Sequence, residues 1–417
     1  MRKQHLRRTL ALLAALCAIL LTAASCASGT EGGGKTVTLY VYNWGEYISD
    51  GSEGTLNVNA EFERYCRETL GMNVKVNYST FSSNEDMYAK ISSGAAVYDV
   101  IIPSDYMIQR MIGEGLIAPL ELDRIPNYEY IFDSFKGDNV YYEPHDGKTY
   151  SVPYTYGMIG VIYNTSIVPE DHPTLGSWEL MWDESFRGDI LQFNNSRDAF
   201  GTALYYLGYD VNEATETEWR EALALLKEQK SLVQGYVMDE IFNKMKSGSA
   251  AVSSYYAGDF LSMYEDNDEL GFYYPSEGTN IYVDAMCIPS NAANYDLALE
   301  YINFLCSEEI AVANAEYHYY ASPNRLVTGN AEYVEYMESV HPNAMKILYD
   351  DVSSVKSTAY LNLAPEKLTL LNELWEDLKV ESSIGVAIYV CCGVILAALL
   401  ALVLFTVLRR RRWAKLY

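Results

Sequence analysis

The loop after the first predicted strand combines aromatic and acidic side chains. Residues 37–42 have the composition of a strand, and Trp44, Glu46 and Tyr47 follow it in a chain with 37 tyrosines among 417 residues. Flat aromatic rings pack against methylene chains and attract ammonium groups, and carboxylates form charge-assisted hydrogen bonds with ammonium groups. This combination predicts a site for a small organic cation.

A second polar loop follows the strand predicted at residues 98–103. Ser104, Asp105 and Tyr106 come next, and Asp105 either faces the site or caps the following helix. In open parallel sheets, ligands bind beyond the carboxyl ends of the strands. We therefore expect both loops to border one crevice.

Catalytic and metal-binding patterns are absent from the sequence, which contains no GxSxG, P-loop, HExxH or GxGxxG motif. The histidines beyond the N-terminal segment are isolated, and the cysteines between the two ends lack metal-binding spacing. These residues are His145, His172, His318, His341, Cys66, Cys287 and Cys306. We therefore predict a binding protein without catalytic residues, cofactor or metal.

Strands and helices alternate in the first part of the chain, which predicts βαβ units and a parallel sheet in an α/β fold. Ser82 and Glu85 are expected to form a capping box at the start of a helix that stops at Gly94. The expected strands are 37–42, 74–78 and 98–103, and the other expected helices are 58–70 and 106–113.

The remaining elements suggest a second lobe. Residues 150–154 and 160–164 are expected as a pair of crossing strands. Further helices are expected at 199–208, 218–229, 240–245, 297–306 and 365–378, and further strands at 250–255, 271–274 and 281–289.

Two lobes are also expected from length, because residues 36–380 exceed the usual size of one hydrophobic core. A flexible tether precedes them at residues 27–35. Lobe 1 is expected to comprise residues 36–153 and 281–330, and lobe 2 residues 154–280 and 331–380.

Both ends of the chain carry membrane signals. Basic residues, an apolar run and small residues make residues 1–26 resemble a lipoprotein signal peptide, with Cys26 as the lipidation site. Ala23 replaces the leucine that usually stands three residues before the lipidated cysteine, so ordinary secretion with cleavage nearby remains open. Residues 384–408 are long and apolar enough for a transmembrane helix. Because the basic tail at 409–417 should stay cytoplasmic, the domain is expected on the outer side of the cell membrane.

The chain is strongly acidic, with a formal net charge of −26. Nine basic residues lie at the two ends, so the residues between them are more acidic still. Such a field concentrates small cations and repels nucleic acid, although a role in solubility alone explains the charge equally well.

Short motifs along residues 36–330 resemble those of the spermidine/putrescine-binding proteins of ATP-binding cassette (ABC) importers. The opening motif is Leu39-Tyr40-Val41-Tyr42-Asn43-Trp44-Gly45-Glu46-Tyr47. Further matching stretches follow in order at residues 78–90, 98–104, 153–157, 207–209, 283–285 and 320–324.

The resemblance implies a two-lobed periplasmic-binding-protein-like fold with a hinge, and it places ligand contacts in this sequence. Asp198 and Asp284 match acids that bind ammonium groups, while Tyr256 and Tyr282 stand where the family commonly has tryptophans. Asn195 stands where spermidine binders have a second carboxylate, so the expected ligand is the polyamine class. The full set of expected contacts is Trp44, Glu46, Tyr47, Ser104, Tyr106, Asp198, Tyr256, Tyr282, Asp284 and Tyr320.

The function implied by the resemblance is capture of putrescine or spermidine and delivery to ABC permease subunits that work with cytoplasmic ATPases. A lipid bilayer is an expected partner through the C-terminal helix and through lipid on Cys26, and nucleic acid is not expected.

Two other functions remain open. Ferric-ion-binding relatives of the same fold use adjacent tyrosines as ligands, and Tyr255-Tyr256 and Tyr319-Tyr320 are such pairs. A membrane-tethered ligand sensor is the second alternative, although the tail after Leu408 is too short for an output domain.

Overall fold

The computed structural model describes residues 35–380 and residue 394. The predictions for the signal peptide, for lipidation at Cys26, for the transmembrane helix at 384–408 and for the tail at 409–417 lie outside these residues. Among the residues described, no helix is both long enough and apolar enough to cross a bilayer.

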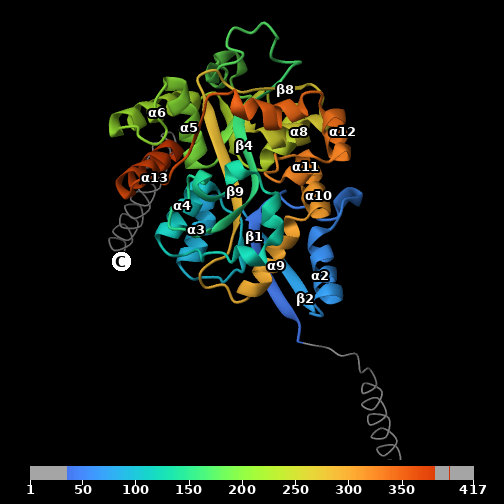
Figure 1. Ribbon diagram of the computed structural model, residues 1–417. Coiled ribbons are helices and arrows are strands. Elements are labelled where there is room, and N and C mark those ends of the chain that lie inside the picture. The colour runs from blue at the N-terminus through green and yellow to red at the C-terminus, as the bar shows by residue number, and fades with distance from the viewer. Residues whose placement is uncertain (1–34, 381–393, 395–417) are drawn as a thin grey trace, which may run out of the picture.

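The described part of the chain is built on one mixed, curled sheet of ten strands (Figure 1). The strand order is β2-β1-β3-β9-β4-β7-β5-β6, with β10 beside β9 and β8 beside β4. The strands are β1 Val37–Trp44, β2 Val74–Phe81, β3 Val100–Ile101, β4 Ser151–Asn164, β5 Ile190–Phe193, β6 Val233–Val237, β7 Val252–Tyr256, β8 Leu270–Tyr273, β9 Thr279–Cys287 and β10 Ser357–Ala359.

Strands β4 and β9 run through the middle of the molecule and belong to both halves of the sheet (Figure 1). They are antiparallel, and their register shifts between Pro153 and Thr155. The predicted crossing pair at 150–154 and 160–164 is therefore wrong, because β4 is one continuous strand. Nearly all of its residues are buried, so it lacks the alternation of polar and apolar residues that marks a half-exposed strand.

The first half of the sheet confirms the predicted parallel βαβ pattern, since β1 pairs in parallel with both β2 and β3. Leu39 and Val41 of β1 pack in one core with Phe62 of α2 and Tyr301 of α9, while Tyr42 belongs to the core on the opposite face. The helices of this half are α2 Val58–Thr69, α3 Asn84–Ser92, α4 Asp105–Gly113 and α9 Tyr295–Leu305.

Helix α3 begins one residue later than the predicted capping box requires. Ser83 is the N-cap, and its side chain accepts a hydrogen bond from the backbone N–H of Asp86. The Ser82–Glu85 box is therefore wrong. Glu85 is free to turn its carboxylate toward Tyr106 instead.

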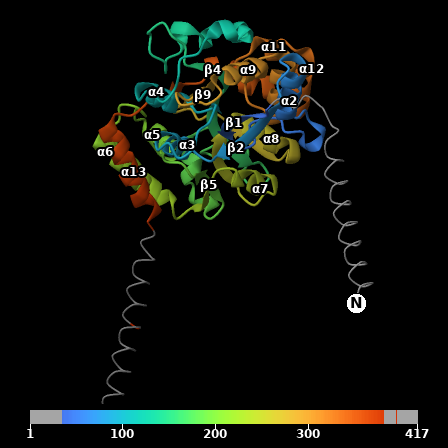
Figure 2. The ribbon, with the colours of Figure 1, turned by 90° about the horizontal axis from the view of Figure 1, so that it is seen from below.

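The second half of the sheet carries helices on both sides. In Figure 2, α6 and α13 lie side by side along one edge, where they pack against each other. The helices that follow β4 in the chain, apart from α9, are α5 Ser196–Leu207, α6 Glu216–Gln229, α7 Glu240–Lys246, α8 Ala257–Asp266, α10 Glu308–His318, α11 Arg325–Thr328, α12 Ala331–Val340 and α13 Pro365–Lys379. Short 3-10 or π turns connect these elements, and one 3-10 turn is Trp178–Trp182.

The three cysteines within the domain are free and buried, as their scattered spacing predicts. Cys66 and Cys306 pack in the core of the first half, and Cys287 lies on β9 in the other core. They contribute as small apolar side chains.

Candidate ligand-binding site

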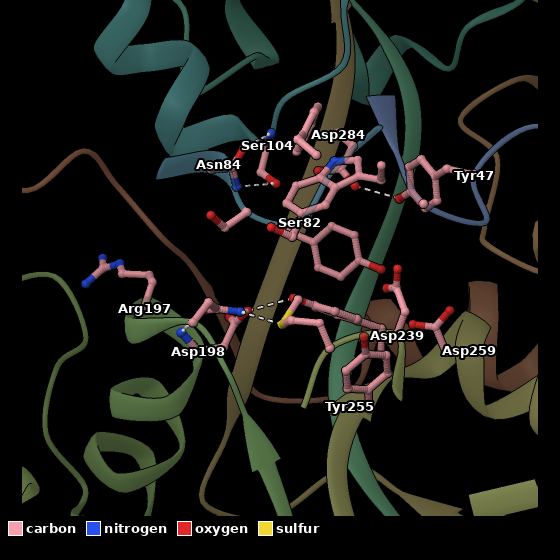
Figure 3. Close-up of a pocket in the computed structure, with 18 of the residues that line it drawn as sticks. Tyr47, Ser82, Asn84, Ser104, Arg197, Asp198, Asp239, Tyr255, Asp259 and Asp284 are labelled. Carbon is pink, nitrogen blue, oxygen red and sulfur yellow. Dashed lines mark hydrogen bonds between the residues drawn. The ribbon is translucent and has the colours of Figure 1, made fainter. Parts of the chain in front are cut away.

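A cleft with about 840 Å³ of empty volume lies where the two halves of the sheet face each other. It is lined by the loops that follow β1, β2, β3 and β5, by the start of α8 and by β9 (Figure 3). All ten residues predicted as ligand contacts line it, namely Trp44, Glu46, Tyr47, Ser104, Tyr106, Asp198, Tyr256, Tyr282, Asp284 and Tyr320.

The loop after β1 forms one wall. The indole ring of Trp44 packs against Phe81 with ring centroids 4.5 Å apart. Glu46 is exposed and has a φ of 51°, which turns the chain sharply. The Tyr47 hydroxyl donates a hydrogen bond to Asp284 Oδ2 at 2.6 Å. This loop therefore links the first half of the sheet to the central strand β9.

Asp284 lies on β9 with 4% of its surface exposed. Tyr47 satisfies its Oδ2, but its Oδ1 has no hydrogen-bond partner among the described residues. Burial raises the pKa of Asp284 to about 6, and the nearby hydroxyl groups of Ser104 and Tyr47 oppose this shift. A buried carboxylate oxygen without a donor is costly, and an ammonium group of a ligand would satisfy it.

Asp198 forms a second acidic point in the first turn of α5. The Tyr256 hydroxyl donates to its Oδ2 at 2.6 Å, and Asn195 Nδ2 donates to the same oxygen at 2.8 Å. Asn195 is the N-cap of α5, since its Oδ1 accepts from the Asp198 backbone N–H at 2.8 Å. Asn195 therefore orients Asp198, and burial raises the pKa of Asp198.

Tyrosines make the remaining wall aromatic. The ring of Tyr282 meets the ring of Tyr256 edge to face at 5.3 Å and that of Tyr320 at 6.4 Å. Tyr320 in turn meets Tyr47 at 4.9 Å. These rings offer flat apolar surface and negative ring faces, which suit methylene groups and cations respectively.

Ser104 and Tyr106 line the cleft through α4. Ser104 Oγ accepts a hydrogen bond from Asn84 Nδ2 at 3.0 Å, and the Tyr106 hydroxyl donates to Glu85 Oε1 at 2.9 Å. Glu85 also lines the cleft, and burial raises its pKa.

Asp105 has a structural role that the sequence did not indicate. It is not a helix cap, because the N-cap position of α4 is occupied by Ser104. Its Oδ2 accepts hydrogen bonds from the Tyr141 hydroxyl and from the Val283 backbone N–H, the latter at 3.2 Å. Burial raises the pKa of Asp105 to about 7. Asp105 thus holds the start of α4 against β9.

Sequence reasoning missed two further acids in the cleft. Asp259 is 7% exposed, accepts a hydrogen bond from the Tyr320 hydroxyl at 2.6 Å, and has a pKa raised to about 8 by burial. Asp239 follows β6, and burial also raises its pKa. Ligands bind beyond the carboxyl ends of parallel strands. This rule pointed to the loops after β1 and β3, and it also finds Asp239 and Asp259 when it is applied to the loops after β6 and β7.

Arg197 is the single cation among the described residues that line the cleft. Its guanidinium donates to the Val211 carbonyl at 3.0 Å and to Asn212 Oδ1 at 2.8 Å, and it stacks on the Tyr360 ring at 4.4 Å. The two hydrogen bonds go to groups outside the cleft, whereas Tyr360 lines it. The acids lining the cleft are Glu46, Glu85, Asp105, Asp198, Asp239, Asp259 and Asp284, so the site favours a cation.

The two tyrosine pairs do not converge on one point. The Tyr319 hydroxyl donates to Glu265 Oε2 at 2.5 Å and lies 2.8 Å from the Tyr336 hydroxyl, and Tyr319 does not line the cleft. Within the described residues, no group of three or more histidines, cysteines, aspartates or glutamates could hold a metal ion. The geometry gives the ferric-ion alternative no support.

A mixed α/β fold whose halves share two long strands, with an acidic and aromatic cleft between them, defines a ligand-binding protein of the periplasmic-binding-protein type. Residues 60–338 match the family of bacterial extracellular solute-binding proteins. The chain belongs to this family, whose members bind solutes outside the cytoplasm and are not enzymes. This membership confirms the predicted class of fold and the predicted absence of catalytic function.

Similar proteins carry related descriptions. The spermidine/putrescine-binding periplasmic protein of Escherichia coli strain K12 is 28% identical over 82% of this chain and 91% of its own length. The putrescine/cadaverine-binding protein of Pseudomonas aeruginosa is 25% identical over 86% of this chain and 98% of its own length.

Solved structures agree with these relatives. A chain from Listeria monocytogenes, assigned to a spermidine/putrescine ABC transporter, is 31% identical with a TM-score of 0.72, covering 82% of this chain and 99% of that one. The spermidine/putrescine ABC transporter substrate-binding protein of Streptococcus pneumoniae is 29% identical with a TM-score of 0.63, covering 82% of this chain and 98% of that one.

Proposed function

We propose that this chain captures a polyamine of the putrescine or spermidine kind and delivers it to an ABC importer. The observation that carries the proposal is Oδ1 of Asp284, which has no hydrogen-bond partner among the described residues. It is buried in a cleft whose walls are aromatic and whose other charges are mostly acidic. A primary ammonium donates the hydrogen bond that this oxygen lacks, and it neutralises the carboxylate. The relatives described as spermidine- or putrescine-binding proteins support this ligand class.

The ten predicted contacts divide into three tasks in this proposal. Asp198 and Asp284 bind ammonium groups, with Glu46 adding negative charge at the exposed edge. Ser104 and Tyr106 complete the polar surface beside α4. The aromatic walls that hold the methylene groups are Trp44, Tyr47, Tyr256, Tyr282 and Tyr320.

Capture would involve closure of two lobes, one formed by residues 36–153 with 281–330 and the other by residues 154–280 with 331–380. The hinge would lie in β4 near Pro153 and in β9 near Ile281. The shift of register between Pro153 and Thr155 supports this position, because it interrupts the regular hydrogen bonding of these two strands. ABC permease subunits would recognise the closed form, and their ATPases would supply the energy.

Anchoring on the outer face of the cell membrane is a further part of the proposal. The composition of residues 1–26 and 384–408 supports lipid on Cys26 and a C-terminal transmembrane helix, followed by a cytoplasmic tail at 409–417. Fractionation of cells that express wild type, Cys26→Ser and a chain ending at residue 380 tests this. Because each variant keeps one of the two anchors, both should stay in the membrane fraction, and release of either variant would contradict double anchoring.

A thermal-shift panel tests the choice of ligand. We expect putrescine or spermidine to raise the melting temperature of the purified chain, because a ligand that binds the folded state stabilises it. Ferric citrate should leave the melting temperature unchanged. A shift with ferric iron and none with any polyamine would reject the proposal.

A further inference from the structure

Helix α10 ends directly beside the ligand cleft. Tyr319, the residue that follows the helix, has a φ of 62°, and its backbone N–H donates to the Ala315 carbonyl at 3.0 Å. This bond closes the helix in the αL motif, which is an uncommon conformation for a side chain as large as tyrosine. The next residue, Tyr320, lines the cleft. The end of α10 therefore sets where the Tyr320 ring lies.

His318, the last residue of α10, binds the backbone of Tyr320. Its Nδ1 accepts a hydrogen bond from the Tyr320 backbone N–H at 3.0 Å. In a Schellman motif a carbonyl of the helix would accept from this N–H, so the imidazole takes the place of that carbonyl. Because Nδ1 accepts, the neutral ring carries its proton on Nε2. Burial lowers the pKa of His318 to about 3, so the ring remains an acceptor at neutral pH.

The imidazole ring also packs against two tyrosines of the cleft. His318 is 5% exposed and does not itself line the cleft. Its ring centroid lies 5.6 Å from that of Tyr47 and 5.7 Å from that of Tyr320. Tyr154 completes the group, with its ring 5.8 Å from His318 and its hydroxyl donating to the Tyr47 carbonyl at 2.8 Å. One buried side chain is therefore in contact with both tyrosines.

The same two tyrosines donate hydrogen bonds to carboxylates of the cleft. Tyr47 donates to Asp284 at 2.6 Å (Figure 3), and Tyr320 donates to Asp259 at 2.6 Å. A site whose side chains are held in place by a supporting layer of contacts does not have to be ordered when the ligand binds. Movement of the 318–320 turn would therefore reduce affinity without removing any ligand contact.

We infer that His318 is a positioning residue of the ligand site, which fixes the backbone of Tyr320 and the rings of Tyr47 and Tyr320 so that Asp259 and Asp284 keep their phenol donors. The inference rests on the proposed polyamine function. His318 acts on the ligand only through the two tyrosines. Loss of its Nδ1 acceptor leaves the buried Tyr320 N–H unpaired, which is unfavourable and allows the turn to move.

Asparagine and leucine at position 318 isolate this hydrogen bond, because the two side chains are similar in size and only asparagine has an acceptor. An asparagine side chain accepts from the N–H two residues further on in an Asx turn. In calorimetric titration of the full chain, His318→Leu should bind spermidine about tenfold more weakly than His318→Asn. His318→Phe keeps an aromatic ring but also lacks the acceptor, so it should lose affinity as well, and it replaces the leucine variant if that variant does not fold.

His341 is the matched control outside the cleft. Its Nδ1 accepts from the Asn343 backbone N–H at 3.1 Å, which is the same bond between residues two apart, and His341 does not line the cleft. His341→Asn and His341→Leu should therefore bind spermidine with equal affinity. A difference at position 341 as large as that at position 318 would show a general effect on the fold and would overturn the inference.

The remaining outcomes separate the inference from the proposed function. Equal spermidine affinities of His318→Asn and His318→Leu would overturn the positioning role and leave the polyamine function intact. A wild-type chain that binds neither spermidine nor putrescine would overturn the proposed function, and this inference with it.

Discussion

At the scale of single residues, the cleft is defined by carboxylates whose hydrogen bonds are only partly complete. Within the part of the chain that the structure describes, Asp284 Oδ1 has no hydrogen-bond partner, whereas Asp198 and Asp259 each accept a hydrogen bond from one tyrosine of the wall. Three aspartates from β9, α5 and α8 thus stand around one aromatic surface. A flexible polycation can satisfy several of them at once.

Replacement of Asp284 by asparagine should weaken polyamine binding by about 2–5 kcal/mol, because a buried ammonium would lose its counter-ion. Calorimetric titration of wild type and Asp284→Asn with putrescine and spermidine measures the change. Asp123→Asn, at an exposed position outside the cleft, is the control and should bind as wild type does. An Asp284→Asn protein within threefold of wild-type affinity would show that this carboxylate does not hold an ammonium.

The raised pKa of Asp259 predicts how its contribution to stability depends on pH. With a pKa of about 8 in the folded state and about 4 when unfolded, Asp259 binds more protons when folded between these values. Its contribution is therefore fully present below about pH 4 and is lost as pH rises through 8. Asp259→Asn should lose less stability than wild type between about pH 5 and 9. Urea unfolding without ligand checks this, and parallel profiles for the two proteins would contradict it.

At the scale of elements, the first turn of α8 brings Asp259 beside Tyr320 through a close backbone approach. A Cβ atom on Gly258 would lie 2.8 Å from Tyr320 Cγ. The ring has little freedom to move away, because it is buried and its hydroxyl is bound to Asp259. Only glycine fits between the helix and the ring.

Gly258→Ala should therefore displace the Tyr320 ring, lower stability by about 1–3 kcal/mol and weaken polyamine binding. Urea unfolding and calorimetric titration measure the two effects. Gly113→Ala is the control, because Gly113 ends helix α4 and a Cβ there meets no heavy atom within 4 Å. If Gly258→Ala and Gly113→Ala have the same free energy of unfolding and the same polyamine affinity, the close packing of α8 against Tyr320 has no role in the site.

Elements with regular patterns could be predicted from the sequence, and elements decided by burial could not. The strand-like composition of β1, the alternation of polar and apolar residues in β2 and the apolar run of β3 located the parallel strands. They also located the polar loops that follow β1 and β3. Strand β4 was divided into two because burial on both faces removes its alternation. The cap of helix α3 was placed one residue early because Ser82 and Ser83 are both capping residues and Ser82 stands three residues before Glu85, whereas the structure has Ser83 as the N-cap.

The site was predicted through resemblance more than through pattern. All ten expected residues line the cleft, but Asp239 and Asp259 were missed because strands β6 and β7 lack a clear parallel pattern in the sequence. The partners of each side chain could not be foreseen. No sequence pattern indicates that Asn195 orients Asp198, or that the Tyr282 hydroxyl, unlike that of Tyr256, has no hydrogen-bond partner among residues 35–380.

At the scale of the whole molecule, the negative net charge of the chain and the burial of carboxylates in the cleft both affect the binding of a cationic ligand. A net charge of −26 attracts cations to the surface, and burial then makes the carboxylates of the cleft hold protons that a bound cation must displace. The pKa of Asp284 is raised to about 6 and that of Asp259 to about 8. Binding of a polycation should therefore release protons.

Polyamine affinity should consequently increase as pH rises from about 5 to 8, because a cation favours the ionised form of both carboxyls. Titrations in buffers of different ionisation enthalpy measure the number of protons released. Asp259→Asn should reduce that number. Proton uptake on binding, or an affinity that is constant across this range, would contradict the role of buried carboxylates in capture.

Calorimetric titration of the purified full chain with spermidine and putrescine at neutral pH tests the central claim most directly. The structure predicts a dissociation constant in the micromolar range or tighter for at least one of them, since an ammonium at Asp284 and aromatic contacts along the methylene chain act together. Absence of binding to both ligands would contradict the assignment of this cleft to polyamine capture.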